Sequence, residues 1–247
     1  MAGHSKWANI RFRKGLQDAR RGKIFTKLIR EISVAARMGG ADETTNSRLR
    51  DAVTKALKAN MKRDTIDNAI KRGVGGLEGA NMMEMRYEGY GPGGVAVLVD
   101  CLSDNKNRTV SEVRHAFTKS GGNLGTDGSV SYLFNKQGEI LLAPTQQEEQ
   151  AMEIAIEAGA DDVVSEDGQM EIITAVENYH AVMSALLAAN FEIEHAHLTM
   201  RAQTTVTLEK DTAESLEKLI DMLEDLDDVQ AVHSNAEYPE HVFESVQ

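Results

Sequence analysis

The sequence has little cysteine and no long hydrophobic run. Its 247 residues include one cysteine, Cys101, so an internal disulfide is excluded. Cys101 follows the apolar run 95–99, which favours a buried structural thiol over a reactive one. No apolar stretch approaches the roughly 20 residues of a membrane helix, and the basic N-terminus lacks the apolar segment of a secretory signal. These absences predict a cytoplasmic protein without a membrane partner, although an Arg-rich start is also typical of organelle-targeting peptides.

Basic residues are scarce over most of the chain but abundant at its start. The net charge is −12, yet residues 1–73 hold 18 Lys and Arg against 7 Asp and Glu, a net charge of +11. The remaining residues carry a net charge of −23. This asymmetry indicates a cationic module joined to an anionic body, and it favours a polyanion as the partner of the module. The alternative is a basic domain that docks on the acidic body of its own chain.

The segment 3–23 combines many cations with few apolar residues. It is too polar to form a core, so we expect either a mobile arm or a helix laid against another part of the protein. Its cations suit contacts with phosphates. Trp7 could stack on a base, but a hydrophobic anchor for the arm is the favoured interpretation. The cations, with Trp7, make up the first part of the predicted nucleic-acid site: Lys6, Arg11, Arg13, Lys14, Arg20, Arg21 and Lys23.

Residues 22–38 follow the spacing of an amphipathic helix. Gly39 and Gly40 are expected to end it. Four cations fall together opposite the apolar stripe and predict a cationic ridge that binds the polyanion. They are Lys23, Lys27, Arg30 and Arg37.

Two shorter helices follow. Ser47 is the expected cap of the second helix, Asn60 its expected stop, and the third helix is expected to end at Gly73. The tight turn near 60–62 is compatible with a helix-turn-helix whose third helix presents Arg63, Asn68, Lys71 and Arg72. Three-helix bundles that contact no nucleic acid are also common.

Beyond a glycine-rich linker, 73–80, strand and helix patterns alternate. Strand, helix and strand are predicted at 95–101, 108–119 and 130–134, and again at 204–208, 213–226 and 229–233. Between them, residues 139–198 read as a complete βαββαβ unit. The order predicts two ferredoxin-like domains, one inserted in the other; a single long mixed sheet would need longer connections.

The fold class is therefore α+β, with a three-helix domain followed by two ferredoxin-like βαββαβ domains. The expected boundaries are 1–79 for the basic helical domain, 80–134 with 200–247 for the split domain, and 135–199 for the inserted domain.

No segment has the pattern of a catalytic or metal site. The glycine-rich loops 89–94 and 121–128 lead into predicted strands, whereas phosphate-binding loops open helices. His195 and His197 share one face of a predicted strand without a third ligand in view. We therefore predict no catalytic residue, no metal, no cofactor and no enzyme activity.

Several strings resemble the YebC/PmpR family, and the resemblance spans the whole chain. The strings are Ala2–Asn9, Gly22–Lys27, Tyr87–Gly94, Asn107–Val110, Gly121–Val130 and Leu219–Val229. Ile10 and Phe12 depart from the family pattern, which leaves a base-specific role of these two positions open.

The resemblance implies a helical domain and two α/β domains, one split by the other. It implies a DNA-binding transcriptional regulator of the bacterial cytoplasm. Some relatives, including a mitochondrial activator of translation of a cytochrome oxidase subunit, act on the ribosome or mRNA instead, and bacterial relatives have been linked to relief of stalling at proline runs. A ribosome-associated translation factor is thus the second hypothesis, and an adaptor that binds protein or a small molecule the third. Weak self-association stays open.

Overall fold

The computed structural model describes residues 21–75, 82–145, 147–166 and 169–238, apart from the side chains of 21–23 and 166. It contains two compact units. One is Tyr132–Thr205, and the other comprises the described residues before and after it. The α+β class, with helices first and sheets after them, is confirmed. The three domain boundaries drawn from the sequence stay a prediction.

The three predicted N-terminal helices are present. They are α2 (Arg21–Gly39), α3 (Ser47–Lys58) and α4 (Arg63–Val74), and we call residues 21–75 the helical domain. The predicted apolar stripe of α2 enters its core from Leu28 onward, whereas Phe25 is exposed. Ile32, Leu49 and Ile66 are fully buried in this core. This core is built from the helical domain's own residues, because its periodic apolar positions face one another across the three helices.

The ends of α3 are set by two asparagines. Asn46, not the predicted Ser47, caps the helix: its side chain accepts the Leu49 N–H at 3.1 Å and donates to the Ala35 carbonyl at 2.8 Å. Asparagine can do both because its amide carries an acceptor and two donors. Asn60, at φ 61°, ends the helix as predicted. The N–H groups of Asn60 and the next residue, Met61, bond back to carbonyls of the last turn, which is a Schellman motif.

At Gly73 the helices α2 and α4 approach each other closely. A Cβ built at Gly73 would lie 2.3 Å from the Ser33 carbonyl oxygen and 2.9 Å from the Ala36 Cβ. The lack of a side chain at Gly73 thus lets the two helices pack directly, backbone against backbone.

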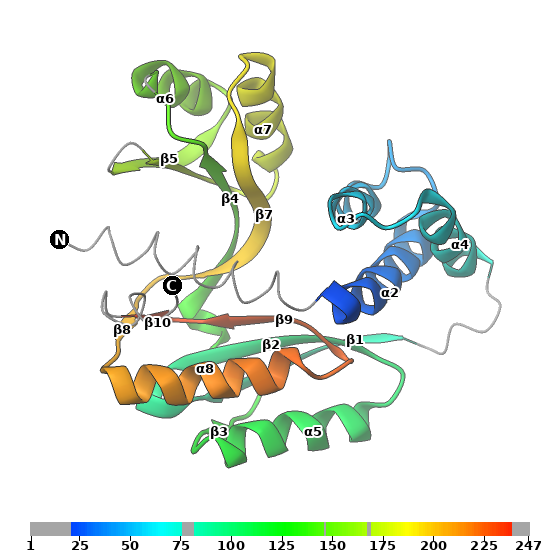
Figure 1. The fold of residues 1–247 in the computed structure, drawn as a ribbon, viewed down its shortest axis with the longest axis vertical. Helices are drawn as coiled ribbons and strands as arrows, with labels where there is room; N and C mark the ends of the chain where they lie inside the picture. Colours follow the sequence, from blue (N-terminus) through cyan, green and yellow to red (C-terminus); the bar gives the residue numbers. More distant parts are fainter. Residues whose placement is uncertain (1–20, 76–81, 146, 167–168, 239–247) are drawn as a thin grey trace. The chain divides into compact units, whose positions relative to one another are not determined.

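A four-stranded antiparallel sheet forms the body of the second unit, in the order β3-β1-β2-β9. Helices α5 and α8 lie together over one of its faces (Figure 1). Their apolar side chains, Phe117 and Leu216 among them, enclose a core with Val97 and Val99 of β2. The elements are β1 (Met83–Tyr90), β2 (Ala96–Ser103), α5 (Lys106–Lys119), β3 (Asn123–Leu124), α8 (Lys210–Glu224) and β9 (Val229–Ser234).

Strands in and around this sheet differ from the prediction. The sequence pattern missed β1, which supplies the second inner strand of the sheet. The expected strand 130–134 is wrong over its first four residues: Ser131–Leu133 form a short 3-10 turn, η2, and the strand begins only at Phe134. The expected strand 204–208 shrinks to β8 (Val206–Thr207), which pairs in parallel with β10 (Ala236–Glu237) in a separate small sheet.

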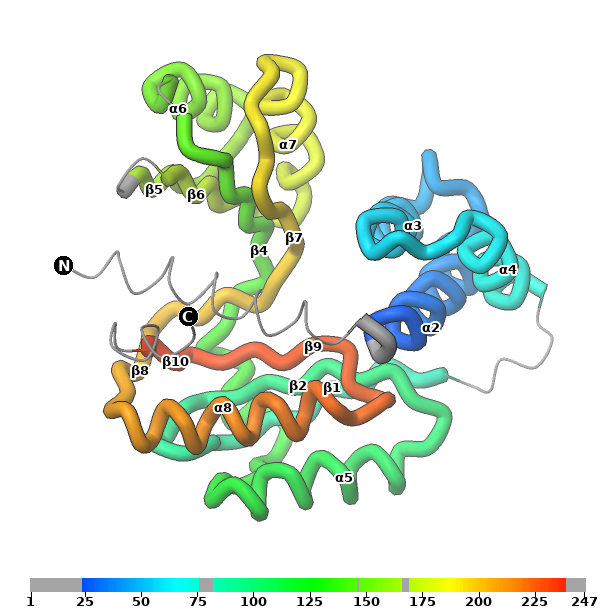
Figure 2. The backbone as a smooth tube through the Cα atoms, viewed as in Figure 1, coloured from blue at the N-terminus to red at the C-terminus, as the bar shows by residue number. Residues whose placement is uncertain are grey.

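The inserted unit has the complete βαββαβ order that the sequence predicts. Its sheet runs β5-β6-β4-β7, and α6 and α7 pack together. The chain enters it through β4 and leaves through β7, which lie side by side in Figure 2. The strand order matches β3-β1-β2-β9, so both sheets are ferredoxin-like, but the split one takes its third strand from β1. The elements are β4 (Phe134–Leu142), α6 (Glu148–Glu157), β5 (Ala160–Glu166), β6 (Gln169–Thr174), α7 (Tyr179–Ala188) and β7 (Ile193–Ala202).

Candidate nucleic-acid interface

The predicted site residues fall into three groups. Lys6, Trp7, Arg11, Arg13, Lys14 and Arg20 lie outside the described residues, as do the side chains of Arg21 and Lys23. The cations Lys27 and Arg30 of α2 are half-buried, whereas Arg37, in the last turn, is exposed. Arg63, Lys71 and Arg72 of α4 are exposed.

Two of the α2 cations that the sequence assigns to a polyanion, Lys27 and Arg30, contact the acidic body. Lys27 donates from Nζ to the Glu224 carbonyl at 2.7 Å. Arg30 donates from Nη1 to the Asp227 carbonyl at 2.6 Å and to the Asp228 carboxylate at 3.0 Å. We call these three hydrogen bonds the docking contact. It corresponds to the alternative raised by the charge asymmetry, a basic domain that docks on the acidic part of its own chain.

Asp228 is a buried carboxylate with donors on both oxygens. Its side chain is 3% exposed, and it accepts hydrogen bonds from Arg108, Ser103 and Thr109 in addition to Arg30. Burial alone would raise its pKa, but the hydrogen bonds from Arg108, Thr109 and Ser103 hold the pKa of Asp228 below its usual value. The carboxylate is therefore ionised and anchored within its own domain.

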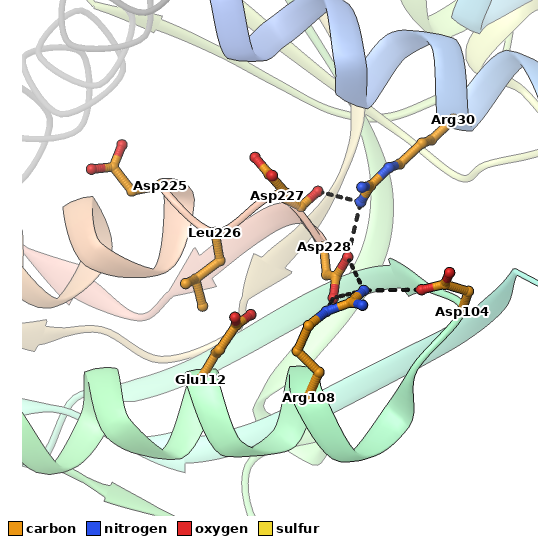
Figure 3. Close-up of a pocket in the computed structure, with 8 residues that line it drawn as sticks. All are labelled: Arg30, Asp104, Arg108, Glu112, Asp225, Leu226, Asp227 and Asp228. Carbon is orange, nitrogen blue, oxygen red and sulfur yellow. Dashed lines mark hydrogen bonds and ion pairs between the residues drawn. The ribbon is translucent and has the colours of Figure 1, made fainter.

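An open hollow of about 730 Å³ lies beside this carboxylate. Figure 3 shows Arg30 reaching into it from α2 and Arg108 from α5, with both guanidinium groups directed at Asp228. Its lining is almost entirely charged: Arg30, Asp104, Arg108, Glu112, Asp225, Leu226, Asp227 and Asp228. Water can therefore reach the docking contact from this side.

A third cation of the helical domain also reaches the sheet. Arg48 of α3 forms a two-pronged pair with Glu31 of α2, at 2.6 and 3.1 Å, and an ion pair with Glu84 of β1. Arg48 was not among the site residues predicted from the sequence, because its partners lie 17 residues before it and 36 after it.

Around the turn between α3 and α4, and at the far end of α4, exposed cations have no partner among the described residues. Lys55 and Lys58 lie at the end of α3 and Lys62 directly before α4, and Lys71 and Arg72 lie in the last turn of α4. We call these five residues the α3–α4 cations. Only Lys71 and Arg72 were predicted as site residues. The spacing of Lys55 and Lys58 within one turn of the predicted helix was a signal for a basic surface, but it does not distinguish solvated cations from paired ones.

The first turn of α4 does not resemble a base-reading surface. Arg63 forms ion pairs with Glu43 at 2.7 Å and with Asp67 at 3.1 Å. Asp64 is exposed in the same turn. A recognition helix places its N-terminal residues at base edges, and here those residues are paired or acidic.

The glycine-rich loop 121–130 is held by one carboxylate. Glu88 of β1 is 7% exposed and accepts the N–H groups of Gly128, Val130 and Ser131 at 2.8 to 2.9 Å. These bonds hold the pKa of Glu88 below its usual value although burial opposes them. They also use the donors that a strand at 130–134 would need. The carboxylate of Glu88 thus fixes the loop from the protein's own sheet, in agreement with a structural loop.

The histidines and the cysteine that the sequence raised as possible metal ligands or reactive groups show no such role in the described structure. The rings of His195 and His197 lie with their centroids 4.5 Å apart and are tilted by 52° to each other. Across the described residues no cluster of three His, Cys, Asp or Glu could hold a metal. Cys101 is buried as predicted, and burial, with the charges of Asp100 and Asp228, raises the pKa of its thiol to about 12. Within the described ranges, no helix is long and apolar enough to cross a membrane.

Comparisons with known proteins cover nearly the whole chain. A protein from Legionella pneumophila named probable transcriptional regulatory protein is 75% identical over 246 residues, the full length of both chains. One of the same name from Coxiella burnetii is 59% identical over 243 residues, 98% of this chain and all of its own. The crystal structure of a conserved hypothetical protein from Aquifex aeolicus matches with a TM-score of 0.79 and 49% identity, over 90% of this chain and 93% of that one.

Two family models match this chain. Residues 5–76 match the TACO1/YebC N-terminal domain and residues 82–236 the TACO1/YebC second and third domain. The chain belongs to the TACO1/YebC family.

Proposed function

We propose that this protein binds nucleic acid and regulates transcription by binding DNA in the cytoplasm, without catalysing a reaction. The name of the Legionella and Coxiella relatives supports a regulatory role. The observation that carries the binding is the set of α3–α4 cations, which are exposed and make no ion pair with another described residue.

Unpaired surface cations suit a polyanion better than the docked ones do. A lysine that already has a carboxylate partner gains little from a phosphate, whereas a solvated one releases a counterion from DNA for each phosphate it neutralises. The acidic residues dominate after residue 73, so we expect the duplex to approach the helical domain and avoid the sheets. We include the arm cations up to Arg20 in the proposed surface because of their positive charge in the sequence.

Selective binding is the test of the DNA hypothesis. Genomic fragments are selected on the full-length protein, and the dissociation constant of the best fragment is compared with that of a random duplex of equal length at 150 mM salt. A regulator should prefer its site by about 10³-fold or more. Equal affinity for the two duplexes would contradict a sequence-selective regulator.

The surface of α4 supports a second candidate, a ribosome-associated translation factor that relieves stalling or activates translation of particular messages. Asp64 and the paired Arg63 leave the first turn of α4 unsuited to reading bases in a major groove. The unpaired cations lie instead at the α3–α4 turn and the end of α4, where they suit phosphates of any nucleic acid. Sedimentation with ribosomes at low salt, with and without a stall at a proline run, tests this candidate. Absence from the ribosomal fractions in both states would exclude it.

A further inference from the structure

The C-terminal end of α8 is strongly negative. The last carbonyls of a helix have no partner within the helix, and the helix dipole adds negative charge at this end. In α8 no basic residue lies in the last turn, and the sequence continues as Glu224-Asp-Leu-Asp-Asp228. Cations from elsewhere in the chain can therefore stabilise this end of the helix.

The docking contact supplies them from α2. Lys27 bonds to the carbonyl of Glu224, the last residue of α8, and Arg30 bonds to the carbonyl of Asp227 three residues on. Both cations belong to the ridge that the sequence assigns to a polyanion. The acidic end of α8 thus occupies the groups that phosphates would use.

The docking contact can separate without leaving a buried charge unpaired. If Arg30 moves away, Asp228 keeps the hydrogen bonds from Arg108, Ser103 and Thr109. The exposed bond to the Asp227 carbonyl lies beside the open hollow, from which water can replace the Arg30 donor. The apolar core of the helical domain shares no residue with the core beneath the sheet. Separation therefore exchanges polar contacts for hydration, at a modest cost for each.

We propose that the docking contact is an autoinhibitory latch: the acidic end of α8 competes with nucleic-acid phosphates for the cations of α2. This proposal rests on the proposed function. The closed latch hides two cations, and bound DNA favours the open state. Linkage requires that a change which opens the latch tighten DNA binding, by at most the factor by which DNA favours opening.

Energy transfer between two dyes reports the latch in the full-length protein. Ala41→Cys, in the exposed loop after α2, and Ser111→Cys, on the exposed side of α5, carry the dyes, and the native Cys101 is buried and does not react. Transfer is measured in 50 mM salt with and without a random 30-base-pair DNA duplex. The latch predicts that the duplex changes transfer at saturation.

A pair of charge-reversal variants distinguishes the effect of opening the latch from the effect of a changed net charge. Asp227→Lys places a cation beside Arg30 and should open the latch without removing a cation of α2. Glu214→Lys is the matched control, because it makes the same charge change at an exposed position of α8, about 15 Å from Glu224 along the helix. Asp227→Lys should change transfer without DNA and bind the duplex about five-fold more tightly than Glu214→Lys.

The outcomes distinguish the two proposals. If the wild-type protein binds the duplex with unchanged transfer, and the two variants bind equally, the latch is overturned and the proposed function stands. If neither the duplex nor a ribosomal RNA fragment binds, the proposed function fails. In that case the difference in transfer between the two variants still measures whether the docking contact opens.

Discussion

Arg108 and Asp228, 120 residues apart in the chain, are joined at 2.9 Å by a hydrogen bond between a guanidinium nitrogen and a carboxylate oxygen. Arg108 lies in the first turn of α5 and Asp228 directly precedes β9, so the pair ties the first half of the split domain to the second. Because Thr109 and Ser103 donate to the same carboxylate oxygen, the Asp228 side chain is the polar centre of this junction.

Asp228→Asn should destabilise the protein by about 1–3 kcal/mol, because a buried acceptor of several hydrogen bonds becomes partly a donor and loses its charge. Unfolding in urea, followed by circular dichroism, measures the loss. Asp225→Asn, in the exposed part of the same acidic run, should change stability much less. Equal losses would contradict the central role of Asp228.

Asp100 should make stability depend on pH in the acid range. Burial raises its pKa, but hydrogen bonds from His233, at 3.3 Å, and Arg86, at 2.7 Å, lower the pKa of Asp100 to about 2. A folded-state pKa below the unfolded value stabilises the protein above the unfolded pKa, and this contribution is lost as pH falls from about 4 to 2. Its size at neutral pH is at most about 2 kcal/mol.

The measurement compares the urea midpoints of wild type and Asp100→Asn from pH 7 to pH 2. The difference between them should shrink below pH 4, when the wild-type carboxylate is protonated. Asp161→Asn, at an exposed position of β5, should show no such convergence. A constant difference for Asp100→Asn across the range would refute the assignment.

Glu88→Ala should loosen the loop 121–130, because three main-chain donors lose their acceptor. The expected cost is about 2–4 kcal/mol. Hydrogen exchange should accelerate most at Gly128, Val130 and Ser131, which a merely global destabilisation would not single out. Glu88→Gln keeps one acceptor oxygen, so its exchange rates at these amides should lie between those of the wild type and of Glu88→Ala. Unchanged exchange at these three amides would count against the clamp.

Gly73→Ala should destabilise the helical domain by about 1–3 kcal/mol, because the new Cβ meets the Ser33 carbonyl across the α2–α4 contact. Asn68→Ala, at an exposed position of the same helix, should be neutral or slightly stabilising, since alanine favours helix. Thermal unfolding of both variants and of the wild type, followed by circular dichroism at 222 nm, measures these changes in stability. A Gly73→Ala protein as stable as wild type would show that the two helices can separate freely.

The α3–α4 cations should set part of the salt dependence of DNA binding. Replacing Lys55, Lys58 and Lys62 together by glutamine should reduce the slope of log K against log salt by up to about 2.7, about 0.9 for each phosphate that is no longer neutralised. Lys106→Gln with Lys119→Gln removes exposed cations of α5 and should leave the slope unchanged. Equal slopes for the triple variant and wild type would place the binding surface elsewhere.

Local periodicity was enough to predict most elements. The stripe ending in Ala35 and Ala36 and the stop at Asn60 are signals within a few residues, so the helical domain followed from them. The inserted unit followed from its alternating order. β1 was missed although Met83, Met85 and Tyr87 alternate with charged residues, which is the pattern of a half-buried strand. Gly89, which lies where Phe117 and the Asn123 carbonyl leave no room for a side chain, weakens that pattern at its end.

The site was less accessible from the sequence. Charge counting found the basic domain, but the partners of Lys27 and Arg30 are main-chain carbonyls 197 residues away, which no residue pattern reveals. Whether a cation is paired or solvated depends on the tertiary fold. For the same reason Arg48 was missed, and Lys55, Lys58 and Lys62 could not be distinguished from paired neighbours.

The nesting of one ferredoxin-like unit in another imposes an order on biosynthesis. The split sheet needs β9, whose Ser234 pairs with Val97 of β2, so it cannot close until almost the whole chain has left the ribosome. The inserted unit closes on itself, and the Gln203 N–H bonds to the Leu133 carbonyl where the chain enters and leaves. Since domains fold as their residues emerge, the enclosed unit can be complete while the sheet that surrounds it in sequence still waits for its last strand.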